Sequence, residues 1–180
     1  MNFESGKNAN ILTFRNKTPK IHKSVFLCSG VQVIGDVVIK EDSSVWFNTV
    51  IRGDVNYIRI GEKTNIQDMC MLHVTHDTHP LVIGNKVTIA HSATLHGATI
   101  HNNSLIGIGA KVLDGSVIES YSLVAAGTVI KEKFKVPGGT LVAGVPGKII
   151  RDLTNTELSR ISETTTNYMK YVAEYRSYLK

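Results

Sequence analysis

The sequence predicts an all-β protein, a parallel β-helix followed by one C-terminal α-helix, and three observations lead to this fold class. Aliphatic residues recur at every sixth position along most of the chain. Glycines lie between them, as in the stretch IGIGAKVLDGSV. After residue 151 the spacing changes to threes and fours. A helix cannot use a period of six, because its apolar face repeats at three and four. Short strands joined by tight turns can use it, with one aliphatic residue pointing inward at each repeat.

The repeats begin near Ile21. Their aliphatic positions are Ile21, Leu27, Val33, Ile39, Val45 and Ile51, then Ile60 and Leu72, and finally Ile100, Ile106, Val112, Ile118, Val124, Ile130, Val136 and Val142. Four residues after most of them stands a small or β-branched residue, such as Val31, Thr49 or Ala110. This pattern resembles the hexapeptide-repeat proteins, over about residues 21 to 151. The resemblance implies a single-stranded left-handed parallel β-helix with three hexads per coil. The left hand comes from the resemblance, because the general rule for parallel crossovers is right-handed.

The C-terminal segment begins with a capping box, Thr154 and Glu157, in the stretch TNTE. Its apolar positions are Leu158, Ile161, Tyr168, Val172, Tyr175 and Leu179. We therefore predict two parts, a β-helix domain over residues 1–151 with a short N-terminal extension and an amphipathic helix over residues 152–180. The apolar stripe is expected to pack on the β-helix or on a neighbouring subunit. A membrane-surface role is disfavoured, because the segment lacks a strongly basic face.

Composition excludes several classes of protein. The chain has 180 residues, of which 42% are hydrophobic and 19% charged, enough for one main globular unit. Its net charge of +5 is scattered along the chain, so nucleic-acid binding is not predicted. No apolar run approaches the roughly 20 residues that span a bilayer. With two cysteines, Cys28 and Cys70, and no signal sequence, we expect a cytoplasmic protein with reduced thiols.

The repeat slips in three places, and counting hexads across the slips aligns several polar residues. Ile51, Leu72 and Leu95 each begin the same face in three successive coils. The residues directly after them are Arg52, His73 and His96. These three should form one outward-facing column, with neighbours about 4.8 Å apart. The preceding face should place Asp68 and His91 in a second column, with Gln67 beside Asp68.

Three histidines with this placement indicate a metal site. Zinc in catalytic sites takes three protein ligands at about 2.0–2.1 Å and keeps one open position. His73 and His96 can lean toward one ion. His91 lies roughly 16 Å from His96 along an extended backbone and around a corner, so it is expected to come from a neighbouring subunit. A cyclic trimer would form three such sites, each with His91 from one subunit and the other two histidines from the next.

Four motifs, IRGDV (51–55), NIQD (65–68), MLHV (71–74) and IAHSATLHG (89–97), are similar to those of the γ-class carbonic anhydrases. The resemblance implies a homotrimer with a metal ion at each subunit interface, zinc by preference with ferrous or cobalt ions as alternatives. It also implies reversible hydration of CO2 to bicarbonate by a hydroxide on that metal. In this interpretation Gln67 hydrogen-bonds the reacting oxygen and Asn65 or Asp68 supports the ligands. Arg52 and Asp54 form an ion pair across the interface, with Arg52 near the bicarbonate product.

Two positions depart from the family pattern. Well-studied archaeal members have a glutamate directly after RGD, where this chain has Val55, and they carry an acidic loop after the first histidine, where this chain has HVTHDTHP. Both features help to export the proton. His76 or Asp77 in the loop, or Tyr168 on the helix, are the candidates to replace them.

Two other functions stay open. Many hexapeptide-repeat trimers are acyltransferases that use one histidine as a general base and a CoA thioester as donor. The histidines here form a ligand set, and only a five-residue insertion is present for an acceptor substrate, so this function is the less favoured one. The second is a scaffold trimer that keeps a metal for stability without catalysis. The Arg52–Asp54 pair could equally be purely structural.

Overall fold

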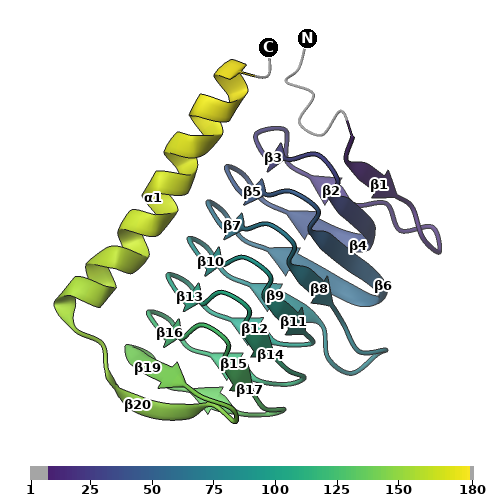
Figure 1. The fold of residues 1–180 in the computed structure, drawn as a ribbon. Helices are drawn as coiled ribbons and strands as arrows, with labels where there is room; N and C mark the ends of the chain where they lie inside the picture. Colours follow the sequence, from purple (N-terminus) through teal and green to yellow (C-terminus); the bar gives the residue numbers. More distant parts are fainter. Residues whose placement is uncertain (1–7, 179–180) are drawn as a thin grey trace.

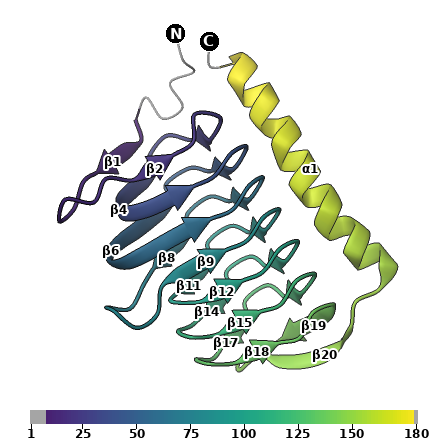
Figure 2. The ribbon, with the colours of Figure 1, turned by 180° about the vertical axis from the view of Figure 1, so that it is seen from behind.

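The chain winds into stacked coils with three flat faces, and one long helix runs along the outside (Figures 1 and 2). This is a computed structural model, and it describes residues 8–178. We name the faces the β8 face, the β9 face and the β10 face, after one strand in each. Every coil contributes one strand to each face, which is the arrangement that a six-residue repeat with three hexads per coil requires.

The β8 and β9 faces belong to one twelve-stranded sheet. Its strands are β1 (Asn10–Leu12), β2 (Lys20–Ile21), β4 (Gln32–Ile39), β6 (Val50–Ile60), β8 (Met71–His73), β9 (Leu81–Ile83), β11 (Thr94–His96), β12 (Thr99–Ile100), β14 (Lys111–Val112), β15 (Val117–Ile118), β17 (Val129–Ile130) and β18 (Lys135–Val136). The long strand β6 joins the two faces, since its first half pairs with β8 and its second half with β9. The β8 face continues through β11, β14 and β17, and the β9 face through β12, β15 and β18.

The β10 face is a sheet of eight strands over the described residues. Its strands are β3 (Phe26–Leu27), β5 (Ser44–Val45), β7 (Asn65–Ile66), β10 (Thr88–Ile89), β13 (Leu105–Ile106), β16 (Leu123–Val124), β19 (Thr140–Ala143) and β20 (Lys148–Asp152). All neighbours pair in parallel except β19 and β20, which are antiparallel. The parallel strands of this face correspond to about seven coils. The predicted parallel β-helix of hexapeptide repeats is therefore confirmed.

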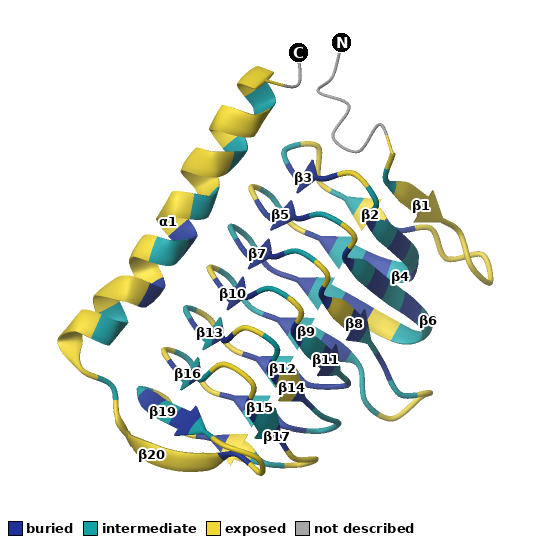
Figure 3. Cartoon of the chain, in the orientation of Figure 1, coloured by how far each residue is buried: buried dark blue, intermediate teal, exposed yellow. Residues whose placement is uncertain are grey.

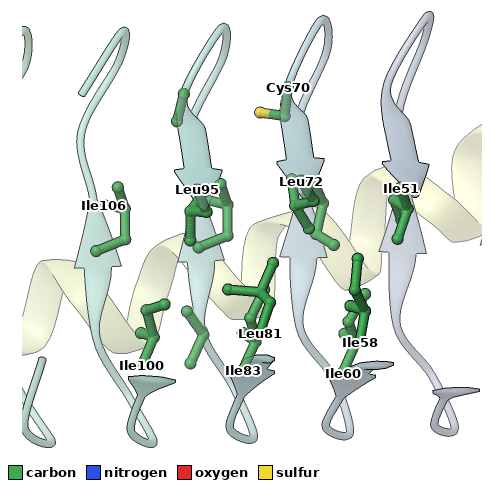
Figure 4. Packing of buried hydrophobic residues seen from close by; sticks show 14 of the residues in the cluster. Ile51, Ile58, Ile60, Cys70, Leu72, Leu81, Ile83, Leu95, Ile100 and Ile106 are labelled. Carbon is green, nitrogen blue, oxygen red and sulfur yellow. The ribbon is translucent and has the colours of Figure 1, made fainter. Parts of the chain in front are cut away.

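The core is a set of aliphatic columns inside the coils (Figures 3 and 4). Ile51, Leu72 and Leu95 pair in register across β6, β8 and β11, and each is fully buried. Burying one such side chain contributes roughly 1.5–3 kcal/mol relative to leaving it exposed. The small residue four positions later is also buried at most repeats. At Thr49, for example, the hydroxyl donates to the Gln67 carbonyl one coil away, at 2.7 Å.

Helix α1 (Asn155–Tyr178) covers the β10 face (Figures 1 and 2). The predicted capping box is present, since Thr154 N–H donates to a Glu157 carboxylate oxygen at 2.9 Å and Glu157 N–H to the Thr154 hydroxyl at 3.3 Å. Of the two expected packing partners, the structure shows the chain's own β-helix. The rings of Tyr168 and Tyr175 each meet Trp46 edge-on at 5.2 Å. Leu179 lies outside the described residues.

Two further sequence expectations concern the environment of the chain. No helix within residues 8–178 is long and apolar enough to cross a membrane. Cys28 and Cys70 are both free and buried. Burial raises the pKa of each thiol to about 12, so both remain protonated at neutral pH. The cytoplasmic location stays a prediction.

Candidate metal centre

His73 and His96 are direct neighbours on the β8 face. β8 and β11 pair in parallel with these two residues opposite one another. Their ring centroids are 5.1 Å apart, and Nδ1 of His73 lies 3.1 Å from Nε2 of His96. Counting hexads across the irregular spacings therefore places these two side chains where the structure has them.

Each of the two rings is held from behind by a carboxylate. Nε2 of His73 lies 3.0 Å from Asp54 Oδ1, and Nδ1 of His96 lies 2.6 Å from Asp114 Oδ1. Burial alone would raise the pKa of Asp54, but hydrogen bonds, first of all from His73, hold it below its usual value. The pKa of Asp114 is likewise lowered against the effect of burial, by hydrogen bonds from Thr75 and His96. Both carboxylates are ionised at neutral pH, so they act only as acceptors.

The partners of the two rings determine where their protons lie. A neutral imidazole that donates through one nitrogen presents a lone pair on the other. His73 therefore presents Nδ1 and His96 presents Nε2, the two atoms that face each other at 3.1 Å. Two converging lone pairs repel unless a proton or a metal ion lies between them. Nitrogens on a tetrahedral zinc ion, at about 2.0–2.1 Å each, are roughly 3.3 Å apart, so this donor pair fits a metal ion.

One chain supplies only part of such a site. Within residues 8–178, no group of three or more His, Cys, Asp or Glu side chains lies close enough to hold a metal ion. His91 is at the turn between β10 and β11, on the edge between the β10 and β8 faces, and its Nδ1 lies 2.7 Å from Asp68 Oδ2. The ring is thus oriented by a carboxylate, as in the other two histidines. Its Nε2 is the nitrogen left for a ligand.

Gln67 and Asn65 lie beside His91, and we call these three residues with Asp68 the His91 half of the site. Both side chains are buried. Gln67 accepts a hydrogen bond from the His91 backbone N–H at 3.2 Å and donates to Asn65 Oδ1 at 3.1 Å. Asn65 in turn donates to the Thr88 hydroxyl at 2.8 Å. Because an amide carries two N–H donors, one proton of Gln67 is left to meet a bound molecule.

Arg52 and Asp54 are paired within the chain. Arg52 Nη1 contacts Asp54 Oδ2 within the same chain, and the other oxygen of Asp54 holds His73. The predicted ion pair across a subunit interface stays a prediction beside this intrachain pair. The two residues stand two positions apart in the extended strand β6, so their side chains lie on the same face of it. Arg52 fixes the carboxylate that orients His73.

The three candidates for proton transfer lie in two different places. His76 pairs with Asp77 at 2.9 Å on the exposed loop after β8. Asp77 N–H donates to the carbonyl of Val55 at 3.4 Å, so this loop reaches the position where the family pattern has its glutamate. Tyr168 lies against Trp46 on the other side. Burial first, and then the charge of Asp68, raise the pKa of the Tyr168 phenol to about 12. The phenol remains protonated and lies near the His91 half.

Two residues of the site escaped the sequence analysis, Asp114 and Thr75. Asp114 lies one coil beyond His96, and the Thr75 hydroxyl donates to Asp114 Oδ2 at 2.6 Å. The only sequence signal is the turn LDG at residues 113–115, which follows LHG at residues 95–97 after one coil. An aspartate before a glycine is common in turns, so that signal does not by itself indicate a functional residue.

The fold and this pair of histidines define a hexapeptide-repeat protein with a candidate metal site. A family model described as bacterial transferase hexapeptide (six repeats) matches residues 97–132. A probable carbonic anhydrase of Methanocaldococcus jannaschii is 40% identical over 158 residues, covering 88% of this chain and 99% of that protein. The chain belongs to the γ carbonic anhydrase family.

Two further relatives add to this picture. The mitochondrial gamma carbonic anhydrase 1 of Arabidopsis thaliana is 40% identical over 90% of this chain, which spans only 61% of that protein's length. A crystal structure of a Bacillus cereus protein, described as a candidate acetyltransferase, aligns with a TM-score of 0.93 and 39% identity, over 95% of this chain and 99% of that one.

Proposed function

We propose that this protein catalyses the reversible hydration of CO2 to bicarbonate, at metal sites shared between the subunits of a homotrimer. One observation carries the proposal: Nδ1 of His73 and Nε2 of His96 converge while their other nitrogens are held by carboxylates. Membership of the γ carbonic anhydrase family supports it. Zinc is the proposed ion, with ferrous or cobalt ions as alternatives, since imidazole binds all of them.

The third ligand in this proposal is His91 of a partner subunit. Its edge of the β-helix is suited to an interface, because apolar side chains surround it. Met69 and Ile108, from the turns of the coils on either side, are 66% and 56% exposed in the isolated chain, and Met71 beside them is 40% exposed. Such exposed apolar patches usually mark a contact with another protein. Docking this edge on the β8 face of a second copy would cover them and complete the ligand set.

The chain's own residues supply binding and orientation. A bound divalent cation acts as a Lewis acid that makes water nucleophilic at neutral pH. Asp54, Asp114 and Asp68 keep the protons of the three rings on the nitrogens that do not face the ion. The free amide proton of Gln67 can donate to an oxygen of the substrate or product. The guanidinium of Arg52, at the β8 face beside this set, offers positive charge to bicarbonate.

Proton export is assigned to the loop after β8. His76 and Asp77 are exposed and paired, and Asp77 reaches the backbone of Val55, where other members have a glutamate. Replacing one glutamate by a paired, solvent-facing histidine keeps a side chain that can accept and release a proton at this place. Because both side chains are exposed surface groups and the family's glutamate is absent, we expect proton export to be slower than hydration itself, and imidazole buffer to accelerate turnover.

The test is metal content and stopped-flow CO2 hydration of protein purified without a histidine tag and without oxygen. Wild type should hold about one ion per chain. His91→Ala should lose the ion and reduce hydration at least about a hundredfold. The matched control is His101→Ala, which removes an exposed histidine on the β9 side that faces Glu119 at 3.8 Å. It should leave both readouts unchanged.

The same assay separates the competing functions. Acetyl-CoA turnover without CO2 hydration would favour the acyltransferase, the activity suggested by the Bacillus cereus neighbour. A bound ion without hydration, even at high imidazole concentration, would favour the metal-binding scaffold. A His76→Ala variant that hydrates CO2 as fast as wild type in weak buffer would remove the loop from the mechanism.

A further inference from the structure

We propose that Thr75 and Asp114 position His96 as a metal ligand, by locking the tautomer and the plane of its ring. This inference deepens the proposed function and rests on its metal site. The three residues form a short chain of hydrogen bonds. The Thr75 hydroxyl donates to Asp114 Oδ2 at 2.6 Å, and Asp114 Oδ1 accepts from His96 Nδ1 at 2.6 Å.

Asp114 can act on His96 only if its carboxylate is itself fixed. One oxygen receives the ring and the other receives the Thr75 hydroxyl, so rotation of the carboxylate would break both bonds. Thr75 is fixed in turn, because its backbone N–H donates to the His79 carbonyl at 3.1 Å and its own carbonyl accepts from Asn56 at 3.1 Å. The side chains of Thr75 and Asp114 are therefore held from both ends.

The backbone at Gly97 leaves room for this contact. Gly97 follows His96 directly and has a φ of +54°, a conformation that favours glycine. A Cβ at this position would lie 2.3 Å from Asp114 Oδ1 and 3.0 Å from the His79 carbonyl oxygen. The carboxylate thus occupies the space that a side chain at residue 97 would fill. This steric observation is independent of the hydrogen bonds and points to the same contact.

The effect on the ligand follows from imidazole chemistry. With Asp114 ionised, the proton of His96 resides on Nδ1, and Nε2 keeps the lone pair that faces His73. Without Asp114 the ring can flip, or it can carry its proton on Nε2 and lose the donor atom. Partners of this kind behind a metal ligand typically change metal affinity by about 10–100-fold.

The experiment is a Co²⁺ titration of the intact protein, followed by visible absorption under argon, with four variants. Asp114→Ala should weaken Co²⁺ binding by about 10–100-fold. Thr75→Val removes the hydroxyl at nearly constant shape and should weaken binding by a smaller factor, whereas Thr75→Ser should restore it. The matched control, Asp36→Ala, removes another half-buried carboxylate, paired with Arg59 at 2.7 Å, and should bind Co²⁺ like wild type.

A second readout needs no metal. ¹⁵N chemical shifts of the histidine rings in metal-free protein report the tautomer, and His96 should carry its proton on Nδ1 in wild type and lose this preference in Thr75→Val or Asp114→Ala. Co²⁺ affinity of Asp114→Ala within about twofold of wild type, or a wild-type His96 protonated on Nε2, overturns the inference alone. Wild-type protein that binds no Co²⁺ overturns the metal site itself. If Asp114→Ala fails to fold, the Thr75→Val and Thr75→Ser pair decides.

Discussion

At the scale of single residues, the candidate metal site depends on residue 97 being a glycine. Gly97 has no Cβ, and its space is taken by the Asp114 carboxylate that holds His96. A substitution here acts in two ways, through backbone strain at positive φ and through displacement of the carboxylate. Only the second should affect metal binding, so the two effects can be separated with a suitable control.

We predict that Gly97→Ala lowers Co²⁺ affinity at least about tenfold, because its methyl group pushes Asp114 away from His96. The control is Gly139→Ala. Gly139 also has a positive φ, +72°, but a Cβ there would meet nothing within 4 Å. Both variants should lose about 1–2 kcal/mol of unfolding free energy from backbone strain, measured in urea, and Gly97→Ala should lose more because its methyl group also meets His79 Cβ at 2.7 Å. Unchanged Co²⁺ affinity in Gly97→Ala would mean that Asp114 does not need its present position.

At the scale of elements, the hexad count predicts most of the architecture and half of the site. The aliphatic residues that recur every six positions are the buried ones along every face. Counting hexads therefore predicts that His73 lies beside His96 and that Asp68 lies beside His91. Counting works because each coil adds a strand in register with the last. It fails at the corners, where loops of unequal length enter. Thr75 lies in such a loop, and its contact with Asp114 depends on the loop's path rather than on any repeat.

The spacing of the repeats also predicts neither the handedness of the coils nor which chain supplies the third metal ligand. A repeat of six is compatible with either hand, and only the resemblance to a known family specifies one. Arg52 and Asp54 pair within the chain because they stand two positions apart on one strand face, and their predicted contact across a subunit interface depends on the assembly rather than on spacing.

The capping box of α1 carries a pH dependence that can be measured. Hydrogen bonds from Arg151, first of all, and from Thr154 lower the pKa of Glu157 from 4.5 to about 2. A lowered folded-state pKa stabilises the fold above the unfolded value, and this contribution is lost as pH falls from about 4.5 to about 2. Glu157→Gln should therefore lower Tm by only about a degree or two near neutral pH, because the pair is exposed.

The difference in Tm between wild type and Glu157→Gln should shrink as the pH is lowered through this window. Circular dichroism at several pH values between about 7 and about 3 measures it. Lys170→Gln, a charge removal on the same helix, serves as the control and should show no such closing difference. A difference that stays constant down to about pH 3 would contradict the role of the Glu157 charge.

At the scale of the whole molecule, the proposed sites belong to the assembly rather than to a chain. Each would join the β8 face of one subunit, with His73 and His96, to the edge of the next, with His91. This arrangement explains why the ligand set is incomplete within residues 8–178 although each of the three rings is already oriented by an aspartate. It also makes a prediction that no site within one chain could satisfy.

His91→Ala and His96→Ala should each be inactive alone, since the first lacks the edge ligand and the second a face ligand. In trimers formed by co-expression, the intact face of a His91→Ala subunit can meet the intact edge of a His96→Ala subunit. In a closed ring each mixed trimer contains one such interface, so random mixing at equal amounts should restore about a quarter of wild-type hydration and bound metal. Mixing the two purified proteins without subunit exchange provides the control. If the co-expressed trimers stay inactive although differently tagged subunits co-purify, the three histidines do not share a site between subunits.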